Sequence, residues 1–169
     1  MKVAPGGNGD YVDLEALWKP IHQERVNTGK ILGWFVYQVG SPSGSEVHHN
    51  YVVITLYPSF DALQGSYPEG IWAEVYPDME WEDVMARTLA ARDHVRGETW
   101  GRVEHIPDTP TAEPAPILQV AYMKVPDGGA GQYRELENLW KKMHAVRIAE
   151  GSMLNWGVYR LRFPSGSNT

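Results

Sequence analysis

The sequence contains one long stretch twice. Residues 11–45 recur as residues 133–167 at a constant offset of 122 residues, without a gap, and 17 of the 35 aligned positions carry the same residue. At ordinary residue frequencies, chance would produce an identity at roughly one position in sixteen. Solenoid and propeller repeats are roughly 20 to 50 residues long, whereas this offset is the size of a small domain. Each copy is therefore predicted to be a folding unit of its own.

The two copies differ in extent. The second copy ends at Thr169, which aligns with Val47, so the segments that follow Val47 in the first copy have no counterpart. The first copy begins at Met1–Val3, which aligns with the end of the apolar run 117–125. We therefore expect a chain that is a fragment, with most of the first strand missing from one unit and the second unit incomplete.

Composition narrows the function classes. The chain has no cysteine, which excludes disulfides, thiol catalysis and cysteine metal sites. Its net charge of −6 has no basic tract to offset it, which argues against nucleic acid and anionic membrane surfaces as partners. No apolar stretch reaches the roughly 18 residues of a membrane span. The compartment stays open, with the cytoplasm as the default and export possible if residues precede Met1.

The apolar pattern predicts an alternation of strands and helices. Apolar residues fall at helical spacing over 11–28 and 133–150, and a glycine follows each run. Asp10 is placed to cap the first helix, and Pro20 is expected to kink it without breaking it. The glycine-rich segments before the two helices are either plain turns or phosphate-binding loops. Strands are predicted at 31–39, 50–57, 99–106, 117–125 and 153–163, a helical turn at 59–63 and a second helix at 78–96.

One unit thus reads strand, helix, strand, strand, helix, strand, which is the order of the ferredoxin-like fold. In this order, in its duplication and in its aromatic strands, the chain resembles the tandem form of the dimeric α/β-barrel superfamily. The resemblance implies an α+β protein whose two ferredoxin-like units form a barrel-like arrangement. The expected boundaries are 1–106 for the first unit, 107–116 for a proline-rich linker and 117–169 for the truncated second unit. The superfamily includes cofactor-independent oxygenases, isomerases and haem-using relatives, but no axial histidine stands out here.

The repeated arginine is the first candidate for chemistry. On a helix of 3.6 residues per turn, Arg25 points within about 20° of Leu14, along the apolar face. A guanidinium placed there must meet a carboxylate, backbone carbonyls or a bound anion, because burying it alone is too costly. Arg25 and its copy Arg147 are therefore either structural, in an ion pair or helix-end contact, or ligand-binding.

The repeated histidine lies beside a repeated tryptophan. His22 follows Trp18 by one helical turn, and His144 follows Trp140 in the same way. A histidine next to a large aromatic side chain in a cleft can act as a general base or hydrogen-bond donor. It can equally be a boundary residue that packs on the tryptophan, and the sequence leaves both interpretations open.

Other repeated residues favour structural roles. Glu15 precedes Lys19 by four residues, which predicts a surface ion pair. Trp34 and Trp156 lie on predicted strands, where they either pack in the core or wall a pocket. His48 and His49 are adjacent and would diverge on a strand, so no metal site is predicted.

These observations predict an aromatic pocket lined by Trp18, His22, Arg25 and Trp34, with Trp140, His144, Arg147 and Trp156 as its copy. The leading hypothesis is a protein that binds a small, anionic or aromatic organic compound. It includes a cofactor-free oxygenase or isomerase reaction, although the sequence does not decide whether the protein is an enzyme. The alternative is a non-enzymatic structural or assembly protein of the same fold. No cofactor is predicted, and the repeat predicts a pseudo-dimer within the chain and a possible homo-oligomer.

Overall fold

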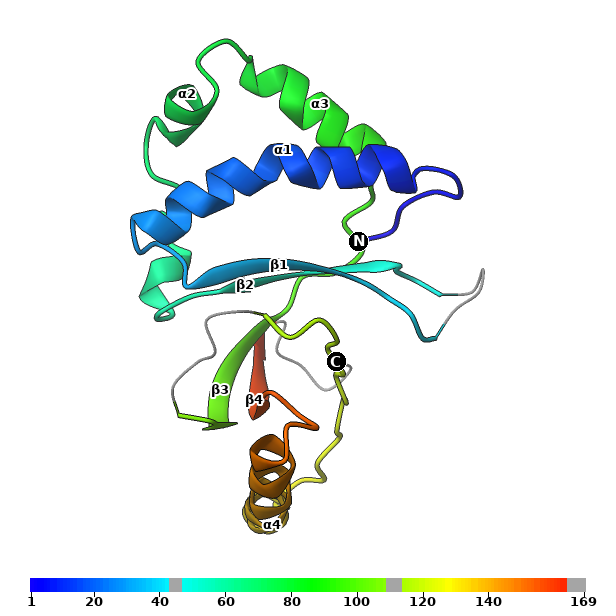
Figure 1. Ribbon diagram of the computed structural model, residues 1–169, viewed down its shortest axis with the longest axis vertical. Coiled ribbons are helices and arrows are strands. Elements are labelled where there is room, and N and C mark those ends of the chain that lie inside the picture. The colour runs from blue at the N-terminus through cyan, green and yellow to red at the C-terminus, as the bar shows by residue number, and fades with distance from the viewer. Residues whose placement is uncertain (43–46, 109–113, 164–169) are drawn as a thin grey trace. The chain divides into compact units, whose positions relative to one another are not determined.

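The computed structural model describes residues 1–42, 47–108 and 114–163, and the chain divides into two compact units (Figure 1). Unit 1 is Met1–Arg96 and unit 2 is Gly97–Thr169. This boundary precedes the expected one at residue 106, because the strand at 99–106 pairs with a strand near the carboxyl end of the chain. Within the described residues the structure is mixed α+β, with two separate two-stranded sheets and no closed barrel.

Unit 1 combines a long helix with a β-hairpin and two shorter helices. The hairpin strands are antiparallel, with Trp34 opposite Thr55 and Val36 opposite Val53. Figure 1 shows α1 between this hairpin and the pair α2 and α3. The elements are α1 (Asn8–Asn27), β1 (Gly33–Gln38), β2 (Tyr51–Leu56), the 3-10 helix η1 (Asp61–Leu63), α2 (Ile71–Val75) and α3 (Trp81–Ala91).

The first three residues extend the hairpin. The Met1 amino group donates to Tyr51 O at 2.8 Å, and Met1 O accepts from Tyr51 N at 3.2 Å, which is antiparallel pairing. On its other edge, the amino-terminal segment pairs with the residues after α3: Lys2 and Asp93 exchange backbone hydrogen bonds of 2.9 and 2.8 Å. The segments before and after α1 therefore lie on opposite sides of β2.

The core of unit 1 is built on one stripe of α1. Tyr11, Leu14, Trp18 and Ile21 are buried at the spacing that the sequence predicts, and each is at most 7% exposed. They pack against side chains from the hairpin, α2 and α3, including Tyr51, Ile71 and Val84, and against Val3. Because a helix stripe of this width buries several large side chains, it supplies much of the hydrophobic stabilisation of the unit.

The described residues of unit 2 form one helix and one pair of strands: α4 (Ala130–Ala149), β3 (Thr99–Ile106) and β4 (Trp156–Phe163). The strands are antiparallel, with Ile106 opposite Trp156 and Gly101 opposite Arg160. Lys141 of α4 forms a 2.9 Å ion pair with Glu104 of β3. None of the residues of α4 is buried.

The two copies have the same local backbone. Helix α4 begins and ends 122 residues after α1, as the repeat predicts. Gly29 and Gly151 both have positive φ, 71° and 76°, and their amides donate 3.0 Å bonds to Val26 O and Ile148 O. Glycine adopts this conformation without a steric penalty, so the same residue ends both helices. Helix α1 is continuous through Pro20, as expected.

Several sequence predictions are wrong. Residues 117–125 form no strand: β3 pairs with β4 in the described part of unit 2, and Ile117 and Tyr122 are exposed. Asp10 does not cap α1, because the helix begins at Asn8 and Asp10 already lies in its first turn. The second helix is shorter than 78–96, ending where Arg92 becomes extended, and α2 within the proline- and glycine-rich stretch was not predicted. The linker prediction falls partly on residues 109–113, which lie outside the described residues.

We predict that equivalent leucines of the two helices differ in their contribution to stability. Leu14 is 1% exposed and Leu136 is 48% exposed. Leu14→Ala should lower the free energy of unfolding by about 2 to 5 kcal/mol, because it leaves a cavity in the core. Leu136→Ala should change it by no more than about 0.5 kcal/mol. Urea unfolding of both variants checks this, and equal losses would contradict the assignment of the core.

Candidate functional site

Four residues predicted to line a pocket come together in unit 1. Trp18, His22 and Arg25 are buried on one face of α1. Trp34 reaches them from β1, and its ring stacks on His22 with centroids 4.5 Å apart and planes at 26°. His22 also stacks on Trp18, with ring centroids 5.9 Å apart. We call Trp18, His22, Arg25 and Trp34 the Arg25 cluster.

The Arg25 guanidinium is 1% exposed, and its contacts are all to neutral groups. Nε donates to Ser66 O at 2.8 Å, and Nη1 donates to His22 Nδ1 at 2.8 Å. Nη2 donates to the Tyr57 hydroxyl at 3.3 Å, and the ring of Tyr67 lies 3.9 Å from the guanidinium carbon. Among the described residues, no carboxylate comes within the 4.0 Å of an ion pair with Arg25. The site therefore holds a buried positive charge that the described residues do not neutralise.

His22 is held as a neutral imidazole. Burial, and then the charge of Arg25, lower the pKa of His22 from 6.5 to about 3. Because Nδ1 accepts the hydrogen bond from Arg25, the ring proton lies on Nε2. Within the described part of the chain, Nε2 has no hydrogen-bond partner, yet it is not among the fully buried atoms. His22 thus offers a hydrogen-bond donor at the edge of the cluster.

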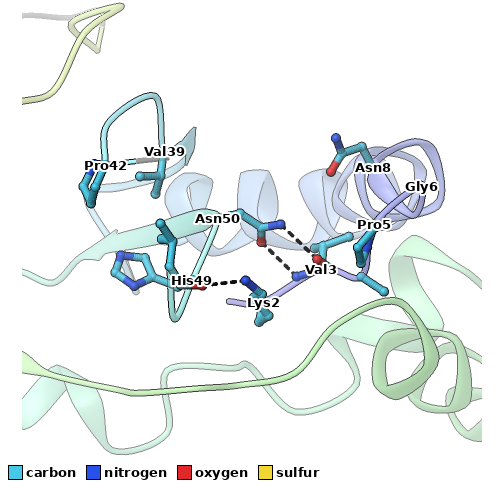
Figure 2. A pocket seen from close by; sticks show the side chains of 11 residues that line it. Lys2, Val3, Pro5, Gly6, Asn8, Val39, Pro42, His49 and Asn50 are labelled. Atoms are coloured by element: carbon cyan, nitrogen blue, oxygen red, sulfur yellow. Dashed lines mark hydrogen bonds between the residues drawn. The ribbon is translucent and has the colours of Figure 1, made fainter. Parts of the chain in front are cut away.

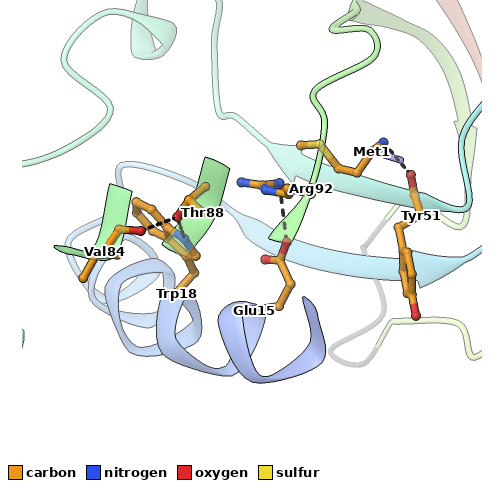
Figure 3. Close-up of polar contacts among 7 residues, drawn as sticks. All are labelled: Met1, Glu15, Trp18, Tyr51, Val84, Thr88 and Arg92. Atoms are coloured by element: carbon orange, nitrogen blue, oxygen red, sulfur yellow. Dashed lines mark hydrogen bonds and ion pairs between the residues drawn. The ribbon is translucent and has the colours of Figure 1, made fainter. Parts of the chain in front are cut away.

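A second polar group beside the cluster joins α1 to α3 (Figure 3). Glu15 is buried and lies 3.4 Å from the Arg92 guanidinium, so the predicted surface pair with Lys19 is wrong. The indole of Trp18 donates to Thr88 Oγ1 at 3.2 Å, and Thr88 Oγ1 donates to Val84 O at 2.8 Å. These contacts fix the face of α1 against α3.

The group around Glu15 also includes two buried or half-buried ionisable groups. Burial, together with the nearby Glu15 carboxylate, raises the pKa of Tyr11. The Tyr11 hydroxyl and Glu15 Oε1 make no well-aligned hydrogen bond, so we attribute this rise to desolvation first and to charge second. Burial, and then Arg92, lower the pKa of the Met1 amino group.

Sequence reasoning missed the residues that complete the cluster. They come from the irregular segment after β2 and from α3, and they are Tyr57, Ser66, Tyr67 and Thr88. Sequence reasoning also missed Arg92, which follows α3 and pairs with Glu15 beside the cluster. None of them belongs to the repeated stretch or stands at a motif spacing. An arginine on the apolar face of a predicted helix indicates that polar partners exist elsewhere in the chain, but it does not identify them.

The copy of the cluster in unit 2 keeps its local geometry without its cover. His144 stacks on Trp140 at 5.8 Å and lies 5.3 Å from Trp156. Arg147 Nη1 is 3.5 Å from His144 Nδ1. Trp140 and Arg147 are nevertheless exposed. The repeated residues are therefore brought together in both units, but only unit 1 encloses them.

A cavity of about 340 Å³ lies elsewhere in unit 1, where the amino-terminal segment meets the end of the hairpin (Figure 2). Lys2, Asn8, His49 and Asn50 contribute its polar groups, and no residue of the Arg25 cluster lines it. Asn50 binds the Val3 backbone with both side-chain atoms, at 2.8 and 2.9 Å, and Lys2 Nζ donates to Val47 O. Lys2 and Asn50 therefore join the amino-terminal segment to the segment before β2.

The glycine-rich segment beside this cavity has a turn geometry. Gly7 N donates to Ala4 O at 3.0 Å, and Gly7 O accepts from Tyr11 N at 3.0 Å. The Gly7 amide therefore has a partner within the turn and does not point at a bound anion. This supports the plain turn over the phosphate-binding loop.

Comparison with known proteins does not assign the chain to a family. The sequence matches no protein-family model, and no curated protein or solved structure is detectably similar to it. Across residues 1–42, 47–108 and 114–163, no three metal-ligating side chains are grouped to hold a metal ion. In the same residues, no helix combines the length and apolar character that a membrane crossing requires.

The pKa of His22 predicts a loss of stability in acid. Between pH 6.5 and about pH 3 the unfolded chain binds a proton at this histidine and the folded chain does not, so folding weakens as the pH falls. His22→Gln keeps an acceptor for Arg25 and removes this proton. Between pH 7 and about pH 4.5, we expect the free energy of unfolding of the variant to fall by about 2 kcal/mol less than that of the parent chain. Urea midpoints at the two pH values measure it.

His144→Gln provides the matched control, because this copy of the histidine lies on a helix with no buried residue. It should lose as much stability in acid as the parent chain. A similar rescue by both variants would show that the acid effect does not come from the buried imidazole.

Proposed function

We propose that unit 1 binds a small organic anion with a flat apolar body at the Arg25 cluster. The observation that carries this proposal is the buried guanidinium whose protein partners are a carbonyl, an imidazole, a phenol and an aromatic ring. A buried charge without a counter-ion is costly, and an anionic ligand would offset that cost. Arginine also presents paired donors that suit a carboxylate.

The surroundings of Arg25 favour a flat ligand that enters beside Tyr67. Tyr67 covers the guanidinium and is itself 48% exposed, so its movement would open the charge to solvent. Trp34 and Trp18 supply aromatic surfaces next to His22. A planar molecule can stack on such surfaces while its acidic group reaches the arginine.

His22 would act as a hydrogen-bond donor to the bound molecule. A group whose conjugate acid has a pKa of about 3 is a weak base at neutral pH, and its Nδ1 lone pair is already used by Arg25. Donation from Nε2–H to an oxygen of the ligand remains available. A cofactor-independent oxygenase or isomerase reaction belongs to the same proposal, as the step that would follow binding.

We also propose that unit 1 has a ferredoxin-like ancestry, as in the dimeric α/β-barrel superfamily. The segments on either side of α1, Met1–Val3 and β1, lie on opposite sides of β2, which is the arrangement of a split β-α-β unit. The matching boundaries of α1 and α4 support a second unit of the same origin.

A second candidate function is assembly without catalysis. It is favoured by α4, which exposes the apolar residues that its copy α1 buries. In this case the repeated residues would stabilise the fold of unit 1 and bind a partner in unit 2.

Binding of aromatic carboxylates tests the first candidate. Benzoate, phenylacetate and salicylate are titrated against the full chain by calorimetry, each beside its neutral carboxamide. We expect each acid to bind at least about tenfold more tightly than its amide, because a charge-assisted hydrogen bond is worth about 1.5 to 3 kcal/mol. Arg25→Met should remove this preference.

Arg147→Met is the control for this experiment, because the copied arginine is exposed and should leave the preference intact. The comparison of acid with amide on the unaltered chain holds whether or not Arg25→Met folds. Equal affinity for acids and amides, or no binding of any acid at about 1 mM, would contradict the proposal.

A further inference from the structure

Helix α4 exposes a face whose copy forms the core of unit 1. Leu136, Trp140 and Met143 are 48%, 47% and 60% exposed, whereas Leu14, Trp18 and Ile21 are 1%, 7% and 1% exposed. Leu139 and Val146 extend the exposed apolar surface. We call these five residues of α4 the α4 face. Exposed large apolar side chains that line up on one helix mark a surface that binds another surface.

The structure shows what covers the same face in unit 1. Trp72 and Trp81 pack edge-on against Trp18, each with ring centroids 5.8 Å away. The Tyr76 hydroxyl donates to Leu17 O at 2.8 Å, and Val84 is fully buried in the same cluster. All these residues belong to the segment Ser66–Arg92, which contains α2 and α3. We call it the cover segment.

The polar partners of the cover segment are also matched on α4. Arg92 pairs with Glu15, Thr88 accepts from the Trp18 indole, and Ser66 O accepts from Arg25. The repeat keeps the α4 counterparts of those three α1 residues, and they are Glu137, Trp140 and Arg147. Helix α4 therefore presents an apolar surface, the α4 face, together with the Glu137 carboxylate and the hydrogen-bond donors of Trp140 and Arg147. In unit 1 the equivalent groups contact the cover segment.

We propose that the α4 face binds a segment of another protein chain that resembles the cover segment. The partner should present a helix on which an aromatic, an aliphatic and a hydroxyl residue follow at intervals of three and four positions, as in Trp81, Val84 and Thr88. An arginine should stand just after the end of that helix, as Arg92 does after α3. Its arginine would pair with Glu137 and its hydroxyl would accept from the Trp140 indole.

A second copy of this chain does not offer this surface. Its own cover segment is already bound to its own α1, where Thr88 and Val84 are buried and Arg92 is paired with Glu15. Moving that segment onto the α4 face of another copy would expose the core of unit 1 in the chain that supplies it. The geometry therefore argues against a second copy as the partner, and it does so independently of whether Arg25 binds an anion.

The test has two arms, both on the full chain. In the first, residues 48–96 are appended after Thr169, which continues the register of the repeat because Thr169 aligns with Val47. In the second, a separate fragment of residues 47–96 is added to the unaltered chain. In both arms we expect amide exchange over residues 136–147 to slow by about tenfold or more, with a blue shift of Trp140 emission.

The matched control is the same appended or added segment with Val84→Asp, which places a charge at a position that is fully buried in unit 1. It should give no protection. Unchanged exchange of α4 in both arms would overturn the proposal. Protection in the appended chain alone would show that the face accepts the segment only within one chain, and would overturn the separate partner. So would a dimer of the unaltered chain that already protects α4.

Discussion

The structure depends on the burial of one stripe of α1. The stripe combines large apolar side chains with Glu15, His22 and Arg25, so it must be covered by a surface that is apolar and also supplies polar partners. The segment containing α2 and α3 meets both needs, since it brings tryptophan rings to the apolar part and a hydroxyl, an arginine and a carbonyl to the polar part. Unit 1 exists as a closed core because this segment is present.

Comparing the two copies separates what the repeated sequence determines from what its surroundings determine. The shared residues give both helices the same boundaries, the same glycine ends and the same stacking of histidine on tryptophan. They do not make a core on their own, because α4 has the same pattern and buries none of its residues. Local geometry follows from the repeated sequence, whereas burial, the lowered pKa of His22 and the unneutralised charge of Arg25 follow from what is packed against it.

This difference explains which predictions hold. Helices and paired strands were predictable from periodicity, because a helix forms from a local apolar pattern and a strand needs in addition only one neighbouring strand to pair with. The run 117–125 has a strand-like composition but pairs with no strand among the described residues, and it stays irregular. The ion pair of Glu15 was assigned to the nearby Lys19, yet Arg92 takes it from 77 positions away because folding brings that residue to the buried side of the helix. Tyr67 and Ser66 carry no pattern at all, and only the folded chain shows that they enclose Arg25.

The same sequence pattern forms core in α1 and surface in α4 because only α1 is covered. Native-state hydrogen exchange of the unaltered chain tests it directly, since both helices are 20 residues long and are measured in one sample. We expect amides over residues 14–25 to exchange at least about a hundredfold more slowly than those over residues 136–147. Equal protection of the two helices would contradict it.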